Sequence, residues 1–201
     1  MASVKLITER LVLRTPIPIT PSSSSSEGSD ATSRDAKGYT YLLTNPKTFE
    51  YEPHKPDLAG KTHEELCAKY EGTAKRWAQS VKEGKSAQLV IYLRDAEGVE
   101  GEGQMIGCGG VNEFRKVAEK EGGGWLADIG VSIHSGHWRK GYASEALRAM
   151  LDWLFQEGTY ANDKDSPSPR DIISKNTSQE DSKSATITQV FAQPLASNLP
   201  Y

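Results

Sequence analysis

Residues 125–155, WLADIGVSIHSGHWRKGYASEALRAMLDWLF, contain the most informative pattern of this sequence. In Trp125–Ile133, apolar residues alternate with polar or small ones, which predicts a strand. Gly141–Gln156 carries apolar residues at helical spacing and is followed by Gly158, which predicts a helix that ends there. A tight basic turn lies between them. A strand, a glycine turn and a helix N-terminus in this order are typical of a site that binds an anion.

The turn itself, residues 138–143 (WRKGYA), has a composition that suits a diphosphate. The backbone N–H groups of the turn and of the first helical residues have no partner inside the helix and can donate to phosphate oxygens. Gly141 lets those oxygens approach the backbone, and Ala143 keeps the first helical turn small. Arg139 and Lys140 add positive charge. Such a turn is also often no more than the start of a helix, so this pattern alone leaves both readings open.

Further helices and strands surround this pattern. Thr62 and Glu65 form a capping box, and apolar residues at helical spacing follow until Gly84, which predicts an amphipathic helix. Alternating apolar residues predict strands, and in the first of these Leu11 and Leu13 share one face. The strands are Lys5–Thr15, Ala87–Arg94, Met105–Val111 and Thr186–Gln193. The predicted order is strand, helical region, three strands, helix and strand.

Two stretches have compositions that resist both helix and sheet. Pro16–Gly38 contains three prolines and a run of five serines, and Asn162–Ser184 mixes proline with Asp, Lys, Ser and Asn. In the second stretch only Ile172 and Ile173 could pack against a core. We therefore predict one domain over residues 1–201, with flexible insertions at 16–38 and 162–184.

The composition limits what the 201 residues can bind. With 24 basic and 27 acidic residues the formal net charge is −3, and no basic stripe is present, so we expect no nucleic-acid partner. No apolar run approaches the roughly 20 residues that span a bilayer, and charged residues interrupt the N-terminal segment. We therefore expect no membrane attachment and a cytoplasmic location, and a nuclear location stays open.

Cysteine and histidine are too sparse to suggest a metal site. We interpret the two cysteines, Cys67 and Cys108, as reduced packing residues. His134 and His137 are three positions apart beside the basic turn, but no cluster of carboxylates or cysteines completes a ligand set. We therefore interpret both histidines as solvated loop residues and predict no bound metal.

Four segments of the sequence share their pattern and order with one known family. They are Thr8–Arg14 (TERLVLR), Met105–Val111 (MIGCGGV), Asp128–Gly130 (DIG) and Trp138–Leu147 (WRKGYASEAL). Together they resemble the GNAT superfamily of N-acetyltransferases, and within it the branch of ribosomal-protein alanine acetyltransferases of the RimJ and RimL kind. The superfamily signature is Gln or Arg, two residues, Gly, one residue, then Gly or Ala. It matches at Gly141 and Ala143 and departs at its first position, where Trp138 stands.

The resemblance implies an α+β fold of three layers, the GNAT acyl-CoA N-acyltransferase fold, in which helices flank a mixed and mostly antiparallel sheet. It also implies acetyl-CoA as the co-substrate. The pantetheine arm is expected between the strands Ala127–Ile133 and Ile187–Gln193, paired with the backbone of the first. The residues that the resemblance assigns to acetyl-CoA are Val131, Ser132, Ile133, Arg139, Lys140, Gly141, Tyr142, Ala143, Ser144 and Asn198.

The implied chemistry is direct attack of an amine on the thioester, so a protein group must accept a proton from the ammonium. Asp128 matches the place of a common acidic residue of the family and is one candidate base, directly or through water. Glu113, just after the preceding strand, is the rival candidate. The alternative for Asp128, a structural carboxylate that only accepts hydrogen bonds, is the more common role of a carboxylate in a sheet. The amine acceptor is expected to bind at the variable helical region, Thr44–Val81.

Family members continue beyond the last strand with a helix and a hairpin. Asn198 matches the family's Asn there, but Tyr201 ends the chain where a Ser is expected, so we expect that helix and hairpin to be missing. Two function classes follow. One is an N-acetyltransferase that acts on a protein N-terminus, a lysine or a small amine. The other is a truncated, non-catalytic protein that binds CoA or serves as an interaction module. A homodimer, in which a second subunit completes the cleft, also stays open.

Overall fold

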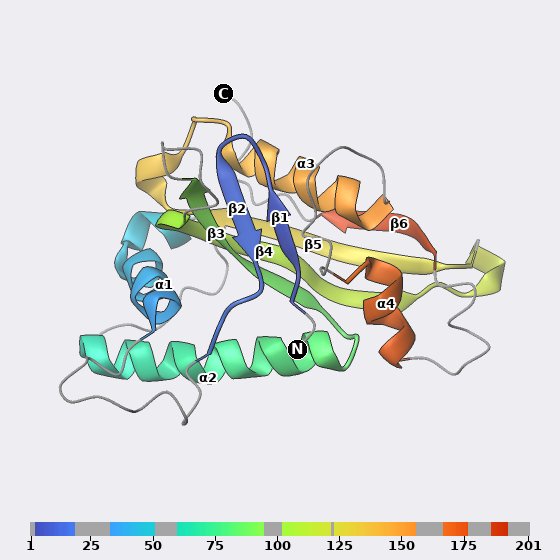
Figure 1. Ribbon diagram of the computed structural model, residues 1–201, viewed down its shortest axis with the longest axis horizontal. Helices are drawn as coiled ribbons and strands as arrows, with labels where there is room; N and C mark the ends of the chain where they lie inside the picture. The colour runs from blue at the N-terminus through green and yellow to red at the C-terminus, as the bar shows by residue number, and fades with distance from the viewer. Residues whose placement is uncertain are drawn as a thin grey trace.

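The computed structural model describes residues 3–18, 33–50, 60–94, 102–121, 123–155, 167–176 and 186–192. Its strands form one six-stranded sheet in the order β1-β2-β3-β4-β5-β6 (Figure 1). The strands are β1 (Lys5–Ile7), β2 (Leu11–Arg14), β3 (Ala87–Arg94), β4 (Glu102–Lys116), β5 (Trp125–Ile133) and β6 (Ile187–Ala192). Neighbours are antiparallel except β5 and β6, which are parallel. The sheet is therefore mixed and mostly antiparallel, as predicted.

Helices of the described ranges flank this sheet. The α-helices are α1 (Arg34–Thr44), α2 (His63–Lys82), α3 (Tyr142–Phe155) and α4 (Pro169–Ile173), and the short 3-10 helices are η2 (Pro46–Phe49), η3 (Glu119–Glu121), η4 (Ser135–His137) and η5 (Ser174–Asn176). The predicted capping box of α2 is confirmed, because Thr62 Oγ1 accepts from the N–H of Glu65 while the Glu65 carboxylate accepts from the N–H of Thr62. None of these helices is long and apolar enough to cross a bilayer.

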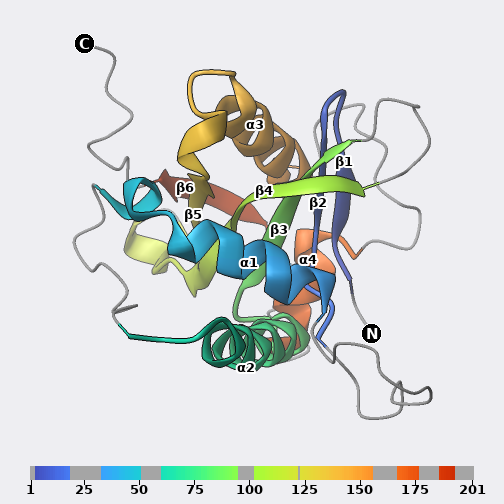
Figure 2. The same cartoon turned by 90° about the vertical axis from the view of Figure 1, so that its left-hand side faces the viewer.

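Helices α3 and α1 cover opposite faces of the sheet. The core on one face joins α3, through residues such as Met150, to Leu11 and Leu13 of β2. On the other face Val12 belongs to a second core, against which Tyr39 of α1 packs. Helix α2 then packs on α1 through a third apolar cluster. Figure 2 shows strands β4 to β6 passing between α3 and α1.

The predicted single strand Lys5–Thr15 is wrong in one respect, because it is a hairpin. Strands β1 and β2 pair antiparallel, and the N–H of Thr8 donates to the carbonyl of Leu11 at 2.9 Å to close the turn between them. The alternation of apolar residues in β2 was predicted correctly, but the polar residues Thr8, Glu9 and Arg10 interrupt the ladder. Those three residues become part of the site described below.

Residues 33–38 correct the prediction that all of Pro16–Gly38 is flexible. Ser33 caps helix α1, because its Oγ accepts a hydrogen bond from the N–H of Ala36 at 3.1 Å. Asp35 and Ala36 are buried, and so is Pro16 at the other end of the stretch. Residues 19–32, which hold the serine run, lie outside the described residues. The serine-rich composition of the stretch led to the wrong prediction for its last residues, where the capped helix α1 begins.

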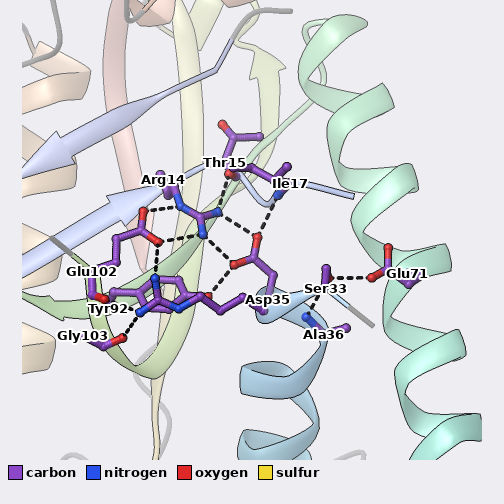
Figure 3. A network of polar contacts seen from close by, with 11 residues as sticks. Arg14, Thr15, Ile17, Ser33, Asp35, Ala36, Glu71, Tyr92, Glu102 and Gly103 are labelled. Atoms are coloured by element: carbon purple, nitrogen blue, oxygen red, sulfur yellow. Dashed lines mark hydrogen bonds and ion pairs between the residues drawn. The ribbon is translucent and has the colours of Figure 1, made fainter. Parts of the chain in front are cut away.

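A buried polar network holds α1 against the sheet (Figure 3). The guanidinium of Arg14 on β2 lies between the carboxylates of Asp35 on α1 and Glu102 on β4. Burial would raise the pKa of Asp35, but hydrogen bonds from Arg14, from the N–H of Ile17 and from the hydroxyl of Tyr92 hold that pKa below its ordinary value. Asp35 therefore stays ionised, and the network ties three strands to one helix.

The prediction that Asn162–Ser184 is a flexible insertion is wrong for its central part. Ile172 and Ile173 of α4 are fully buried in the same core as α3. Ser168 and Asp171 form a capping box at the start of α4, with Pro169 at the first helical position. The indole N–H of Trp153 also donates to the carbonyl of Pro167 at 3.2 Å. A short capped helix therefore docks on the core, and residues 162–166 and 177–184 lie outside the described residues.

Candidate active site

The turn between β5 and α3 has an unusual backbone. Arg139 and Gly141 both adopt left-handed conformations, with φ of 60° and 81°. The indole N–H of Trp138 donates to the carbonyl of Ile133 at 2.6 Å, and Lys140 Nζ donates to the carbonyl of Gly136 at 3.1 Å. These contacts fold the turn back over the end of β5. Arg139, Lys140 and Gly141 are exposed, so the outer side of the turn is open to a ligand.

This turn presents a row of unpaired donors. Among the described residues, no group accepts a hydrogen bond from the backbone N–H of Gly141, Tyr142, Ala143 or Ser144; the first such bond of α3 runs from the N–H of Glu145 to the carbonyl of Gly141, at 3.0 Å. Unpaired N–H groups at the start of a 14-residue helix, together with the positive end of its dipole, favour an anion. The predicted diphosphate site therefore has the donors it requires.

An open stretch of strand edge leads to the turn. Strand β6 pairs with β5 only from Trp125 to Ile129, so within the described ranges residues 130–133 of β5 pair with β4 alone. Val131 and Ser132 are half-buried and Ile133 is buried. The carbonyl of Ile133 is already bonded to the indole N–H of Trp138. The other backbone groups on the open side can pair with an extended ligand, as expected for the pantetheine arm.

The two candidate bases lie side by side. Glu113 on β4 is the direct cross-strand partner of Asp128 on β5, next to a register shift after Val111. Directly opposed residues project to the same face, here the one that α1 covers, because Ile129 beside Asp128 points into the α3 core. Asp128 is half-buried and Glu113 is exposed. The structure thus places the two residues opposite each other on β4 and β5, with Asp128 two positions before the open stretch of β5.

The interpretation of His134 as a solvated loop residue is wrong. Its side chain is buried, its Nε2 lies 2.8 Å from the amide nitrogen of Asn45, and its Nδ1 accepts from the N–H of Gly136 at 3.1 Å. The ring of Tyr41 stacks on it with centroids 4.3 Å apart. A nitrogen that accepts an N–H carries no proton, so this imidazole is neutral, and burial lowers its pKa accordingly.

His137 is half-buried, and burial followed by the nearby charge of Lys140 lowers its pKa. No group of three or more His, Cys, Asp or Glu that could hold a metal occurs in the described part of the chain. Cys67 and Cys108 are not joined by a disulfide. The site therefore rests on backbone donors and carboxylates.

A pocket of about 560 Å³ adjoins the turn. Its lining joins the β1–β2 turn to the first turns of α3, and consists of Thr8, Glu9, Arg10, Gly141, Ser144, Glu145 and Arg148. Sequence reasoning missed Arg10 and Glu145 as site residues. The available signal was the polar run Thr8–Arg10 inside a predicted strand. Of the other assigned residues, Asn198 lies outside the described residues.

Comparison with known proteins agrees with this geometry. A model of the acetyltransferase (GNAT) domain matches residues 29–198. No curated protein matches the chain. Among solved structures, the microcin C7 self-immunity acetyltransferase MccE, in complex with acetyl-CoA and AMP, is 11% identical with a TM-score of 0.50, over 75% of this chain and 66% of that one.

Two further solved structures are similar at lower TM-scores. RimJ of Mycobacterium smegmatis, in complex with CoA-disulfide, is 18% identical with a TM-score of 0.47, over 75% of this chain and 60% of that one. An acetyltransferase from Agrobacterium tumefaciens is 24% identical with a TM-score of 0.44, over 76% and 67%. The chain spans about two thirds of the length of these enzymes or less. At these identities the likeness concerns the fold alone.

Proposed function

The chain belongs to the GNAT family of acetyltransferases, and from this premise we propose that it transfers the acetyl group of acetyl-CoA to an amine. The observation that carries the proposal is the row of unpaired N–H groups from Gly141 to Ser144, which adjoins the open edge of β5. The diphosphate of acetyl-CoA suits the unpaired N–H groups, and its extended, amide-bearing pantetheine arm suits the open edge of β5. MccE and RimJ, two proteins of similar fold, were solved with acetyl-CoA and with CoA-disulfide.

In this proposal each part of the site holds one part of the co-substrate. The N–H groups of residues 141–144 bind the diphosphate, and Arg139 and Lys140 add charge from the exposed side of the turn. The backbone of Val131 and the N–H of Ile133 pair with the pantetheine amides, and Ser132 lies between them. This arrangement orients the thioester along β5 toward Asp128, and the orientation itself lowers the barrier for a bimolecular reaction.

Catalysis then requires a proton acceptor near the amine. The amine that receives the acetyl group arrives as an ammonium at neutral pH. Asp128 or Glu113 takes its proton, so that the nitrogen lone pair can attack the thioester carbon. The C–N bond forms, the C–S bond breaks, and the sulfur leaves as a thiolate that takes up a proton. Backbone N–H groups of β5 on its open side are placed to stabilise the oxyanion that forms in between.

The acceptor is an amine whose class the family leaves open. The carboxylates of Asp128 and Glu113 lie on the face of the sheet that α1 covers, and two adjacent acidic side chains suit a cationic amine. The sequence resemblance to the RimJ and RimL branch favours a protein N-terminus as the first acceptor to test, before a lysine or a small amine. Helices α1 and α2, which lie over this face, are the elements that would select it.

Binding is the first experiment. We expect calorimetry to detect acetyl-CoA binding by the parent chain, and Gly141→Asp to weaken it more than about tenfold, because a carboxylate would stand where the diphosphate is held. Gly123→Asp is a matched control, since Gly123 also has a positive φ, of 65°, but lies at the turn before β5. Equal affinities of the parent and Gly141→Asp would contradict the proposed diphosphate site.

Turnover is the second experiment. Release of free thiol from acetyl-CoA is followed with a panel of amines: peptides with free N-termini, the same peptides acetylated but containing lysine, and small polyamines. We expect acceptor-dependent thiol release. Acetyl-CoA binding without thiol release for any amine would instead favour the alternative of a non-catalytic CoA-binding protein.

A further inference from the structure

The turn that precedes α3 is held in a conformation that its own sequence does not favour. Arg139 is a non-glycine residue with φ of 60°, a region that costs free energy for any residue with a Cβ. Gly141, two residues later, is also left-handed. Such a conformation persists only when surrounding contacts determine it. Contacts with other parts of the chain therefore fix the direction of the N–H groups of this turn.

One of these contacts comes from the β1–β2 turn. Arg10 Nη1 donates to the carbonyl oxygen of Lys140 at 3.0 Å. That oxygen and the N–H of Gly141 belong to one planar peptide group and point in opposite directions. A bond that fixes the carbonyl of Lys140 therefore also fixes the direction of the Gly141 N–H, the first of the four unpaired donors.

Arg10 is in turn held by Glu145 of α3. The Glu145 carboxylate, whose side chain is 14% exposed, accepts from Arg10 Nε at 2.7 Å and from the Arg10 backbone N–H at 3.0 Å, and pairs with Nη2 at 2.6 Å. It also accepts from the hydroxyl of Thr8. The guanidinium lies over the ring of Tyr142, 4.8 Å from its centroid. The Glu145 carboxylate and the Tyr142 ring thus hold the guanidinium that bonds the Lys140 carbonyl, and Thr8 holds Glu145 in turn.

The same guanidinium limits what can stand at position 141. A Cβ added to Gly141 would lie 3.4 Å from Arg10 Nη2. A residue with a side chain at position 141 would therefore contact the Arg10 guanidinium and could displace it from the Lys140 carbonyl.

We propose that Arg10 is a positioning residue for the diphosphate of acetyl-CoA, which acts through the Lys140–Gly141 peptide and is itself aimed by Glu145. This inference rests on the proposed function. It gives the polar run Thr8–Arg10 a role in the site, although these residues are more than 125 positions from the turn in the sequence.

A simpler account would be that Arg10 only adds positive charge to the pocket. Arg148 lines the same pocket and is exposed, and its side chain makes no hydrogen bond or ion pair with another residue of the described ranges. Replacing Arg148 removes the same charge without touching the turn. Replacing Arg10 with lysine keeps the charge but removes the planar fork that bonds Glu145 and the Lys140 carbonyl together. The two accounts therefore predict opposite results.

The experiment measures the dissociation constant of CoA by calorimetry at 0.15 M salt. We expect Arg10→Lys and Glu145→Gln each to weaken CoA binding about tenfold, because each removes a hydrogen bond that orients the group binding the charged ligand. We expect Arg148→Ala to change CoA binding less than about twofold. A weakening by Arg148→Ala as large as that by Arg10→Lys, or unchanged CoA affinity in Arg10→Lys and Glu145→Gln, overturns the proposal.

Pantetheine, which lacks the diphosphate, separates positioning from a general structural role. We expect its affinity, measured by NMR titration, to be the same in the parent, Arg10→Lys and Glu145→Gln, because only the diphosphate meets the turn. An equal loss for pantetheine and CoA shows that the variants disturb the whole cleft and overturns the proposal. If the parent chain binds neither CoA nor pantetheine, the proposed function is overturned as well. If the parent binds CoA and the variants bind it equally well, only this inference is overturned.

Discussion

Arg14 donates two parallel hydrogen bonds to Asp35, from Nη1 at 2.8 Å and from Nη2 at 2.7 Å. The pair joins strand β2 to helix α1 across 21 positions of sequence, and its two side chains are 10% and 2% exposed. Because a buried charge is costly without its partner, neither residue can be replaced alone without leaving the other uncompensated. The pair therefore fixes α1 on the face of the sheet that carries Asp128 and Glu113.

We predict that Asp35→Asn lowers the free energy of unfolding by about 3 kcal/mol, because it leaves the Arg14 guanidinium buried with only Glu102 to balance it. Urea denaturation followed by circular dichroism measures this value. Glu83→Gln is the control: Glu83 pairs with Lys85 at 2.8 Å on the surface, and its loss should not shift the midpoint measurably. A similar small effect of both changes would show that the buried network contributes little.

Helix α4 provides a second stability test. We predict that Ile173→Ala costs about 3 kcal/mol of unfolding free energy, since it removes methyl groups from a fully buried position. Arg170→Ala, on the exposed side of the same short helix, should leave the stability within about 0.5 kcal/mol of the parent. If Ile173→Ala behaves like Arg170→Ala, then α4 does not dock in solution as it does in this structure.

Local signals were enough to predict much of the fold. Helix α2 has a capping box and a continuous apolar stripe, and strands β3 to β5 have apolar alternation bounded by glycine-rich turns. Each of these signals lies within about 20 residues, so the sequence alone contains it. The turn between β5 and α3 was predictable for the same reason, because strand, glycine and helix follow one another directly, and its role in binding a diphosphate stays a prediction.

Three of the missed features depend on contacts between distant segments. Helix α1 is fixed by the Arg14–Asp35 pair. His134 is bonded to Asn45, which follows α1 and lies 89 positions away, and Arg10 bonds Glu145 at a separation of 135. No periodicity or composition encodes such a pairing. Helix α4 was missed for another reason. Its flanks are polar and rich in proline, so the composition predicted a flexible segment despite the two adjacent isoleucines.

The two histidines of the site predict how stability depends on pH. The folded pKa values of His134 and His137 are lowered from 6.5, mainly by burial, so the unfolded chain binds protons more readily than the folded one. Stability is therefore fully present above about pH 6.5 and falls as the pH drops from there toward the folded pKa values. We expect thermal melts to show this loss between pH 7 and 5.5, and His134→Gln to show a smaller loss over the same interval.

A second, more acidic interval belongs to the carboxylates. The pKa values of Asp35 and Glu145 are held below their ordinary values by their hydrogen bonds, against the effect of burial, so their contribution is lost only as the pH falls below about 4.5. The histidine interval can therefore be measured separately. A parent chain whose melting temperature is constant from pH 7 to 5.5 would contradict the neutral, buried state of His134.

The last prediction decides between the two candidate bases. Asp128 is half-buried on β5, the strand whose open edge is expected to hold the pantetheine arm, whereas its cross-strand partner Glu113 is exposed on β4. Proximity to that edge favours Asp128, so we predict that Asp128→Asn lowers kcat about 100-fold or more while Glu113→Gln lowers it less than about fivefold. Neither change removes a diphosphate contact, so the KM for acetyl-CoA should stay near the parent value in both.

The pH profile of kcat distinguishes a base from a residue that only orders the strand. A base must be unprotonated to act, so kcat of the parent rises with pH through the apparent pKa of that group. Asp128→Asn should abolish this rise, and Glu113→Gln should retain it. A reversed pattern would assign the base to Glu113. Small losses with an intact rise in both variants would mean that the ammonium loses its proton to another group or to water before it reaches the thioester.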